Sequence, residues 1–172
     1  SFTPTTINTW EIADINFDNY TGTDAITITK TTVFIYGKFY KVTFGGNESV
    51  TIPAGENAVS DAVECEVRAQ TVFFVSFYLA DFTQMRSVVF AKGPFTSGSY
   101  AIGDQTMTEM VDVDITRKTH YFYFLSNVSV LTDRKNRTIV CYGDSITAQD
   151  WPDYLSLRCR TEGYENTAVI RR

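Results

Sequence analysis

The sequence predicts a mainly β protein: an antiparallel, jelly-roll-like β-sandwich over residues 1–137, followed by a β-α-β segment over residues 138–172. Two observations support this prediction. From residue 26 onward, short runs of β-forming residues alternate with Gly, Pro, Asn and Asp, which is typical of sandwich strands joined by tight turns. At residue 138 the pattern changes to a continuous apolar run, a tight turn and a helical pattern, which predict a parallel α/β arrangement.

The composition fits a chain with a packed core. The 172 residues are 44% hydrophobic and 15% aromatic, enough for one domain, or for one domain and part of another. No stretch approaches the run of about eighteen apolar residues that a membrane helix needs, and no signal-peptide pattern follows Ser1. We therefore expect a soluble chain, trimmed at its start, without a membrane partner.

The charge distribution and the small number of Cys and His residues argue against nucleic-acid-binding, metal-binding and disulfide-linked proteins. The net charge is −5, and Lys and Arg are scattered except in DRKNR at 133–137, so no cationic stripe predicts a nucleic-acid partner. Cys65, Cys141 and Cys159 have no CxxC spacing, and His120 is the single histidine. These residues predict neither a zinc site nor a disulfide framework. We expect no metal and no cofactor.

The sequence leaves localisation open. Its acidic, Thr- and Tyr-rich composition favours secretion or the cell surface over the cytoplasm. Asn-X-Ser/Thr triplets begin at Asn19, Asn47, Asn127 and Asn136. They would accept glycans in a eukaryotic secretory pathway, although chance explains most of them in a chain this rich in Ser and Thr.

The sandwich strands are expected in seven runs separated by turn residues. Glycines in GGN (45–47) and PAG (53–55) supply the positive φ that tight turns use. The stretch TVFFVSFYL at 71–79 is apolar on both alternating faces, which predicts a central strand covered on both sides, with a second layer on its outer face. The runs are AITITKTTVFIYG, FYKVTFGG, SVTIPAG, VECEVRA, TVFFVSFYLAD, SVVFAKG and YFYFLSNVSVL.

The last 35 residues predict one β-α-β unit. TIVCY at 138–142 has the continuous apolar character of a buried parallel strand, and the turn GDS follows. A helix is expected with Asp150 as N-cap, Pro152 in its first turn and Gly163 at its end. Trp151, Tyr154, Leu155 and Cys159 recur at helical spacing, and TAVIRR at 167–172 is the next strand. One such unit cannot bury its own faces, so we expect it to need further chain.

Ser145 is the candidate nucleophile. A serine at the carboxyl end of a parallel strand, where a helix begins, can present its N–H to a developing oxyanion, and ligands of open α/β sheets bind at this edge. Gly143 allows the sharp turn, and Asp144 can hold it through its carboxylate. Because Gly, Asp and Ser are also the commonest turn formers, spacing alone leaves an ordinary turn open. No GxxxxGK[ST], GxGxxG or GxSxG motif offers another site.

A longer match supports the catalytic interpretation. IVCYGDSIT followed by WPDYLSLR closely resembles the first sequence block of the GDSL or SGNH hydrolases. Upstream, VTFGGNESVTIPAGENAVSDAVECEV, FFVSFYLAD and YFYFLSNVSVL resemble the N-terminal β-sandwich domain of a bacterial subfamily. Together these similarities cover residues from about 33 to 172.

The resemblance implies a flavodoxin-like α/β domain and metal-independent ester hydrolysis through an acyl-serine. Ser145 would be the nucleophile, its N–H an oxyanion donor, and Asp144 with Gly143 the support of the turn. The family's later glycine and asparagine blocks and its Asp-X-X-His base are absent from these residues. His120 follows Arg117 rather than an aspartate at that spacing, so it is expected to be structural or on the surface.

Two functions follow as hypotheses. The first is a serine esterase acting on a small ester or an acetylated carbohydrate, inactive as 172 residues alone and completed by the remainder of the SGNH domain, from the same gene or a companion chain. The second is a non-catalytic β-sandwich that binds carbohydrate or another partner. Tyr121 and Tyr123 alternate with Phe122 and Phe124, so one face could stack on sugars; these rings could equally be buried in a core or interface.

Overall fold

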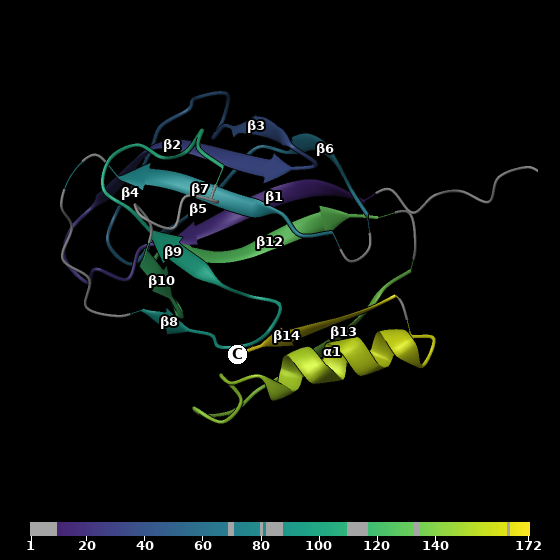
Figure 1. Cartoon of the computed structure of the whole chain (residues 1–172). Helices are drawn as coiled ribbons and strands as arrows, with labels where there is room; N and C mark the ends of the chain where they lie inside the picture. Colours follow the sequence, from purple (N-terminus) through teal and green to yellow (C-terminus); the bar gives the residue numbers. More distant parts are fainter. Residues whose placement is uncertain are drawn as a thin grey trace, which may run out of the picture. The chain divides into compact units, whose positions relative to one another are not determined.

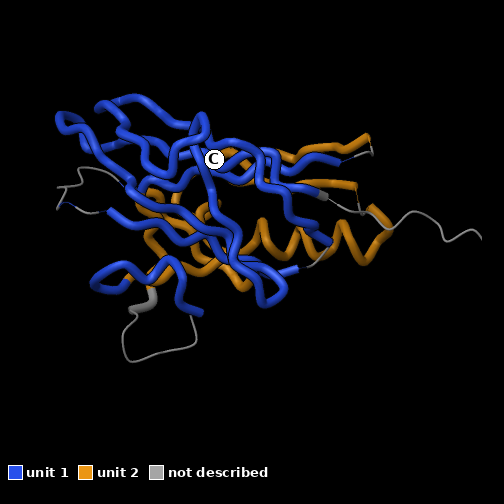
Figure 2. The backbone as a smooth tube through the Cα atoms, turned by 90° about the horizontal axis from the view of Figure 1, so that it is seen from above, with its two compact units in different colours: residues 1–88, 101–115, 124–133 blue, residues 89–100, 116–123, 134–172 orange. Residues whose placement is uncertain are grey.

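The structure is a computed structural model that describes residues 10–68, 71–79, 81, 88–109, 117–132, 135–164 and 166–172. The described chain is mainly β, as predicted, and forms two compact units (Figures 1 and 2). Unit 1 comprises Ser1–Val88, Ala101–Ile115 and Phe124–Asp133, and unit 2 comprises Val89–Tyr100, Thr116–Tyr123 and Arg134–Arg172. Each unit therefore combines segments that are distant in sequence. The predicted domain boundary at 137/138 stays a prediction.

The first sheet of unit 1 is built around β1 (Trp10–Asp18), which no predicted run included. β1 pairs antiparallel with three strands, and its register shifts between Ile12 and Asp14. This bulge places Ile12, Ile15 and Phe17 on the same inner face, although Ile12 and Ile15 are an odd number of residues apart. The partners of β1 are β5 (Asn57–Val59), β6 (Val63–Val67) and β12 (Leu125–Leu131).

The second sheet is built around β2 (Ile26–Ile35). Its antiparallel partners are β3 (Lys38–Val42), β4 (Val50–Ile52) and β7 (Phe74–Leu79). The two sheets share one core, in which the Phe17 and Phe77 rings meet edge to face with centroids 5.2 Å apart. Unit 1 is thus a sandwich of two antiparallel sheets, seen as two layers of strands in Figure 1.

The prediction that β7 is a central strand covered on both sides is wrong. Among the described strands β7 pairs only with β2, and its side chains are half-buried or exposed. Its inward residues pack on the core, whereas Phe74 on the other face lies 6.3 Å from the Phe34 ring, which itself meets Phe39. Contacts among these aromatic rings account for the apolar residues on the outer face of an edge strand.

Unit 2 contains the predicted β-α-β unit. β13 (Arg137–Cys141) and β14 (Thr167–Arg171) are parallel, and α1 (Trp151–Thr161) connects them (Figure 1). Two short antiparallel pairs belong to the same unit: β8 (Val89–Phe90) with β11 (Tyr121–Phe122), and β9 (Gly98–Tyr100) with β10 (Arg117–Thr119). α1 is the one helix in the described ranges, and no helix there is long and apolar enough to cross a membrane.

The ends of α1 agree with the prediction in position but not in every contact. Pro152 lies in the first turn, and Asp150 precedes the helix, yet the Asp150 side chain makes no capping hydrogen bond. Its carbonyl accepts hydrogen bonds from the N–H groups of Asp153 (3.0 Å) and Tyr154 (3.2 Å) instead. At the other end Gly163 has φ +87°, and the N–H of Tyr164 donates to the Cys159 carbonyl at 2.7 Å, which is a Schellman ending.

The apolar residues of the β-α-β unit are less buried than predicted. In β13 only Cys141 is buried, while Val140 is 54% exposed and Ile170 of β14 is 42% exposed. Trp151 and Tyr154 are exposed too, and the buried helical residues are Pro152 and Asp153. The expectation of a fully buried strand is therefore wrong for this chain, because two strands and one helix have too little surface to cover one another.

Candidate functional site

The parallel strands β13 and β14 end at the same edge of their sheet (Figure 1). Ser145 lies on the exposed turn that follows β13 in the sequence. The pairing of β13 with β14 continues past the ends of the two strands toward this turn. Arg172 N–H donates to the Cys141 carbonyl at 2.9 Å, and Gly143 N–H donates to the Arg172 carbonyl at 3.1 Å. The start of the serine turn is therefore attached to the end of β14.

Gly143 is needed because another side chain approaches its backbone. A Cβ at this position would collide with Oγ1 of Thr147 and would lie 3.1 Å from the Thr147 Cβ. Thr147 is buried under the turn, with 8% of its surface exposed, so it has little room to move. The φ of Gly143 is outside the left-handed region, so close approach rather than backbone freedom requires glycine here.

Asp144 closes the turn around Ser145. Its Oδ1 accepts a hydrogen bond from the N–H of Ile146 at 2.9 Å, which is an Asx-turn arrangement. Its carbonyl accepts hydrogen bonds from Thr147 N–H (3.0 Å) and Ala148 N–H (3.2 Å). The Asp144 side chain and backbone therefore both act on the residues that directly follow Ser145.

The helix begins at Trp151, as the predicted N-cap Asp150 implies, and therefore not directly after Ser145. Residues 145–148 form turns of their own. The N–H of Ser145 is thus not one of the free N–H groups in the first turn of α1. Since the field of a helix end weakens beyond its terminal turn, the local turn, and not the helix, sets the surroundings of this N–H.

His120 lies in a different part of unit 2. It is exposed between β10 and β11, its ring meets Phe90 edge to face with centroids 6.3 Å apart, and its carbonyl accepts a hydrogen bond from Ala91 N–H at 3.0 Å. In the described part of the chain, no histidine or carboxylate side chain is hydrogen-bonded to the Ser145 hydroxyl. The structure brings Gly143, Asp144 and Ser145 together, but it does not join His120 to them.

The two tyrosines that could stack on a sugar are exposed. Tyr121 is 49% exposed and Tyr123 is 37% exposed, and the Tyr121 ring lies 5.5 Å from the ring of Phe90. Phe124, the next aromatic residue along the chain, is buried in the sandwich core with φ +65°. In the Tyr/Phe alternation seen in the sequence, the phenol rings of Tyr121 and Tyr123 are therefore exposed, whereas Phe124 belongs to the core.

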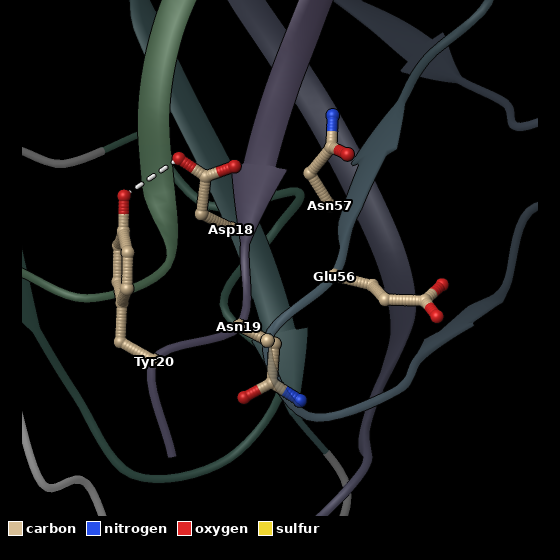
Figure 3. Close-up of a pocket in the computed structure, with 6 residues that line it drawn as sticks. Asp18, Asn19, Tyr20, Glu56 and Asn57 are labelled. Carbon is tan, nitrogen blue, oxygen red and sulfur yellow. Dashed lines mark hydrogen bonds between the residues drawn. The ribbon is translucent and has the colours of Figure 1, made fainter. Parts of the chain in front are cut away.

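An open, polar pocket lies at the end of β1, away from the serine turn in sequence (Figure 3). Tyr20 Oη donates a hydrogen bond to Asp18 Oδ2 at 2.7 Å. Asn19 is buried, and its Nδ2 donates to the Asp24 and Ile52 carbonyls, both at 2.8 Å. Because this amide already holds the loop, Asn19 is not available as a glycan acceptor in the folded chain. Lining residues are Asp18, Asn19, Tyr20, Gly55, Glu56 and Asn57.

Three side chains near the serine turn were missed by the sequence interpretation: Thr147, Asp153 and Arg171. A signal for Arg171 was present, because the carboxyl ends of parallel strands share one edge of a sheet. A charged residue at the end of TAVIRR must therefore lie near the loop that follows TIVCY. Asp153 sits in the first turn of the helix, and no sequence motif pointed to its carboxylate.

The sequence matches no protein-family model, and a search of the curated proteins finds no relative. Within the described ranges, no three His, Cys, Asp or Glu side chains lie together as metal ligands would.

Proposed function

We propose that this protein is a serine ester hydrolase of the SGNH type, in which Ser145 is the nucleophile and the substrate is a small ester or an acetylated carbohydrate. One observation carries the proposal. The Ser145 hydroxyl is exposed on a turn at the carboxyl edge of parallel strands, and α/β proteins bind their ligands at this edge. The Asp144 carboxylate and the close contact of Gly143 with Thr147 fix that turn.

The reaction has two steps, each with a defined role for Ser145. A base removes the hydroxyl proton, the Ser145 oxygen attacks the ester carbonyl carbon, and the Ser145 N–H donates to the oxyanion that forms. The alcohol leaves with the proton, and an acyl-serine remains. Water, deprotonated by the same base, then attacks the acyl carbon and releases the carboxylic acid and the free hydroxyl.

The base and the remaining oxyanion donors belong, in this proposal, to further SGNH-type sequence of the same polypeptide or of a companion chain. His120 is the single histidine among the 172 residues. The exposed apolar side chains of Val140 and Ile170 support this part of the proposal, because parallel sheets are normally covered on both faces. Neighbouring strands and helices of a larger α/β sheet would cover them.

A serine-directed fluorophosphonate tests the proposal in the complete gene product. We expect covalent labelling of the peptide that contains Ser145, and loss of ester hydrolysis by on the order of 10³-fold or more in Ser145→Ala. Ser49, which is also exposed, provides the control, since Ser49→Ala should keep full activity. Undiminished turnover of p-nitrophenyl acetate by Ser145→Ala would rule out the assignment.

A second function, a carbohydrate-binding module without catalysis, is favoured by the exposed rings of Tyr121 and Tyr123. Such rings stack on the apolar faces of sugars. Affinity electrophoresis in polysaccharide gels separates the two functions. A binding module would be retarded equally as wild type and as Ser145→Ala, would lose retardation in Tyr121→Ala, and would not react with the phosphonate.

A further inference from the structure

Arg171, at the end of β14, is a largely buried cation that contacts three segments of unit 2. Its side chain is 17% exposed, and its guanidinium forms an ion pair with the Asp153 carboxylate of α1. It also donates hydrogen bonds to the carbonyls of Gln149 (3.0 Å), Lys92 (3.1 Å) and Ala148 (3.3 Å). The three carbonyls surround Nη1, while Nη2 meets the Asp153 carboxylate, so two nitrogens of one rigid plane serve this set of partners.

Asp153 is the buried partner of this cation. Its side chain is 10% exposed, and its second oxygen, Oδ2, accepts a hydrogen bond from the N–H of Phe95 at 3.3 Å. A Cβ on Gly93 would collide with this same carboxylate oxygen. The turn 92–95 between β8 and β9 therefore approaches Asp153 so closely that glycine is required at one position.

The contacts of Arg171 lead directly to the serine turn. The Ala148 carbonyl accepts hydrogen bonds from Arg171 and from Lys92 N–H (3.1 Å). The Ala148 N–H donates to the carbonyl of Asp144 at 3.2 Å, and Asp144 is bonded through its own carbonyl carbon to Ser145. The path from the guanidinium to the candidate nucleophile thus consists of two hydrogen bonds, the backbone of Ala148 and the peptide bond between Asp144 and Ser145.

A buried ion pair of this kind is a poor source of net stability, because removing both charges from water costs about as much as their attraction returns. What it provides is a fixed geometry for the groups that it joins. The exposed pair between Arg158 and Glu162 on α1 differs in this respect: its atoms are 3.8 Å apart and its side chains are 79% and 59% exposed. Such a pair constrains little.

We propose that Arg171, held in place by Asp153, is a positioning residue for Ser145. By binding the carbonyls of residues 148 and 149, it fixes the loop that determines the direction of the Ser145 hydroxyl and N–H, and it attaches the turn 92–95 to the same loop. The catalytic part of this inference rests on the proposed function of Ser145.

The structural part of the proposal is that Arg171 fixes the loop 144–150 and the turn 92–95. Hydrogen exchange of the complete protein tests it in wild type, Arg171→Lys, Arg171→Gln and Asp153→Asn. We expect exchange at residues 144–150 and at the Phe95 amide to accelerate about tenfold or more, with unchanged protection of β1 and β2. Arg171→Lys keeps a cation beside Asp153 and decides the result if Arg171→Gln does not fold. Arg158→Gln is the matched control and should exchange as wild type does. Unchanged exchange of residues 144–150 in Arg171→Lys overturns the proposal.

The catalytic part is tested by the kinetics of fluorophosphonate labelling and ester turnover. The labelling amplitude measures how much protein is folded, and the rate constant measures how well each folded molecule presents Ser145. We expect Arg171→Lys to keep the amplitude and lose about tenfold in rate constant and in kcat, with little change in KM. If Arg171→Lys shows a lower labelling amplitude with an unchanged rate constant, Arg171 only supports folding, and the proposal that it positions Ser145 is overturned. Absence of labelling in wild type overturns the proposed function, while the exchange experiment still decides the attachment of the loop.

Discussion

The hydroxyl of Thr31 is buried in the sandwich core without a hydrogen-bond partner among the described residues. Thr31 lies on β2, is fully buried, and within the described ranges its Oγ1 is the buried side-chain atom that lacks a hydrogen-bond partner. A register shift between Ile28 and Lys30 turns this residue inward. A hydroxyl removed from water without a partner is unfavourable, so this position lowers the stability of the core.

Replacing Thr31 with valine should therefore stabilise the protein. Valine has nearly the same shape and removes the unsatisfied oxygen, so we expect the free energy of unfolding to rise by about 1 kcal/mol. Thr27→Val is the control, because Thr27 is on the same strand with its hydroxyl bonded to Thr51 at the surface. Urea denaturation measures both changes. A loss of stability in Thr31→Val would show that the hydroxyl has a partner in solution.

Gly143 gives a second prediction at this scale. Alanine there would push against the buried Thr147, and overpacking of this kind costs about 1–3 kcal/mol. We expect Gly143→Ala to lower the rate of phosphonate labelling of Ser145 in the complete protein. Adding Thr147→Ala removes Oγ1, the atom that would collide, and should restore part of the rate. Equal rates in all three proteins would show that the turn does not depend on this contact.

At the scale of elements, the loop after β3 is held by one carboxylate. Asp61 accepts hydrogen bonds from Thr43 Oγ1 (2.6 Å) and from the N–H groups of Gly46 (2.8 Å) and Gly45 (3.0 Å). Both glycines have positive φ, as the sequence predicted for this turn. The hydrogen bond from Thr43, followed by that from Gly46, lowers the pKa of Asp61.

This shift predicts how the loop responds to acid. The lowered pKa means that the ionised carboxylate stabilises the folded state above the ordinary pKa of aspartate, about 3.9, and that this contribution disappears as the pH falls through the lower folded value. Asp61→Asn should thus lose stability relative to wild type at pH 7, and the difference should vanish in strong acid. Carboxyl-carbon NMR measures the pKa directly, and Thr43→Val should raise it; an unchanged midpoint would contradict the assigned cause.

Elements that lie in a run of β-forming residues between turn signals, or that have clear helix-end signals, were predictable from the sequence. The strands predicted in this way include β2, despite its register shift between Ile28 and Lys30, and β3, β4, β6, β7, β12, β13 and β14; the helix α1 was predicted from its ends. β1 was missed because its bulge breaks the period of two between Ile12 and Ile15, and β9 and β10 are too short to show any period. β8 and β11 lie within the predicted runs SVVFAKG and YFYFLSNVSVL. At the candidate site, Gly143, Asp144 and Ser145 are adjacent in sequence, whereas Asp153 and Arg171 meet only through the fold.

At the scale of the whole molecule, the two units differ in how much core they contain. The buried hydrophobic cluster lies in unit 1, and in the described part of unit 2 the buried residues are few: Cys141, Thr147, Pro152 and Asp153. Because apolar burial supplies most of the favourable free energy of folding, unit 1 carries most of the stability of this chain. Unit 2 depends on hydrogen bonds and the Asp153–Arg171 pair, which set geometry more than stability.

This difference in core size predicts that a mutation in the core of unit 1 lowers the stability of unit 1 much more than that of unit 2. Ile15 is fully buried in unit 1, and Ile15→Ala should cost about 2–5 kcal/mol through lost burial and the cavity it leaves. Native-state hydrogen exchange should show the loss in β1 and β2, with much smaller changes in β13 and β14. Val59→Ala, at an exposed position of β5, should change stability by less than about 0.5 kcal/mol. An equal loss of protection in both units would show instead that they unfold as one cooperative body.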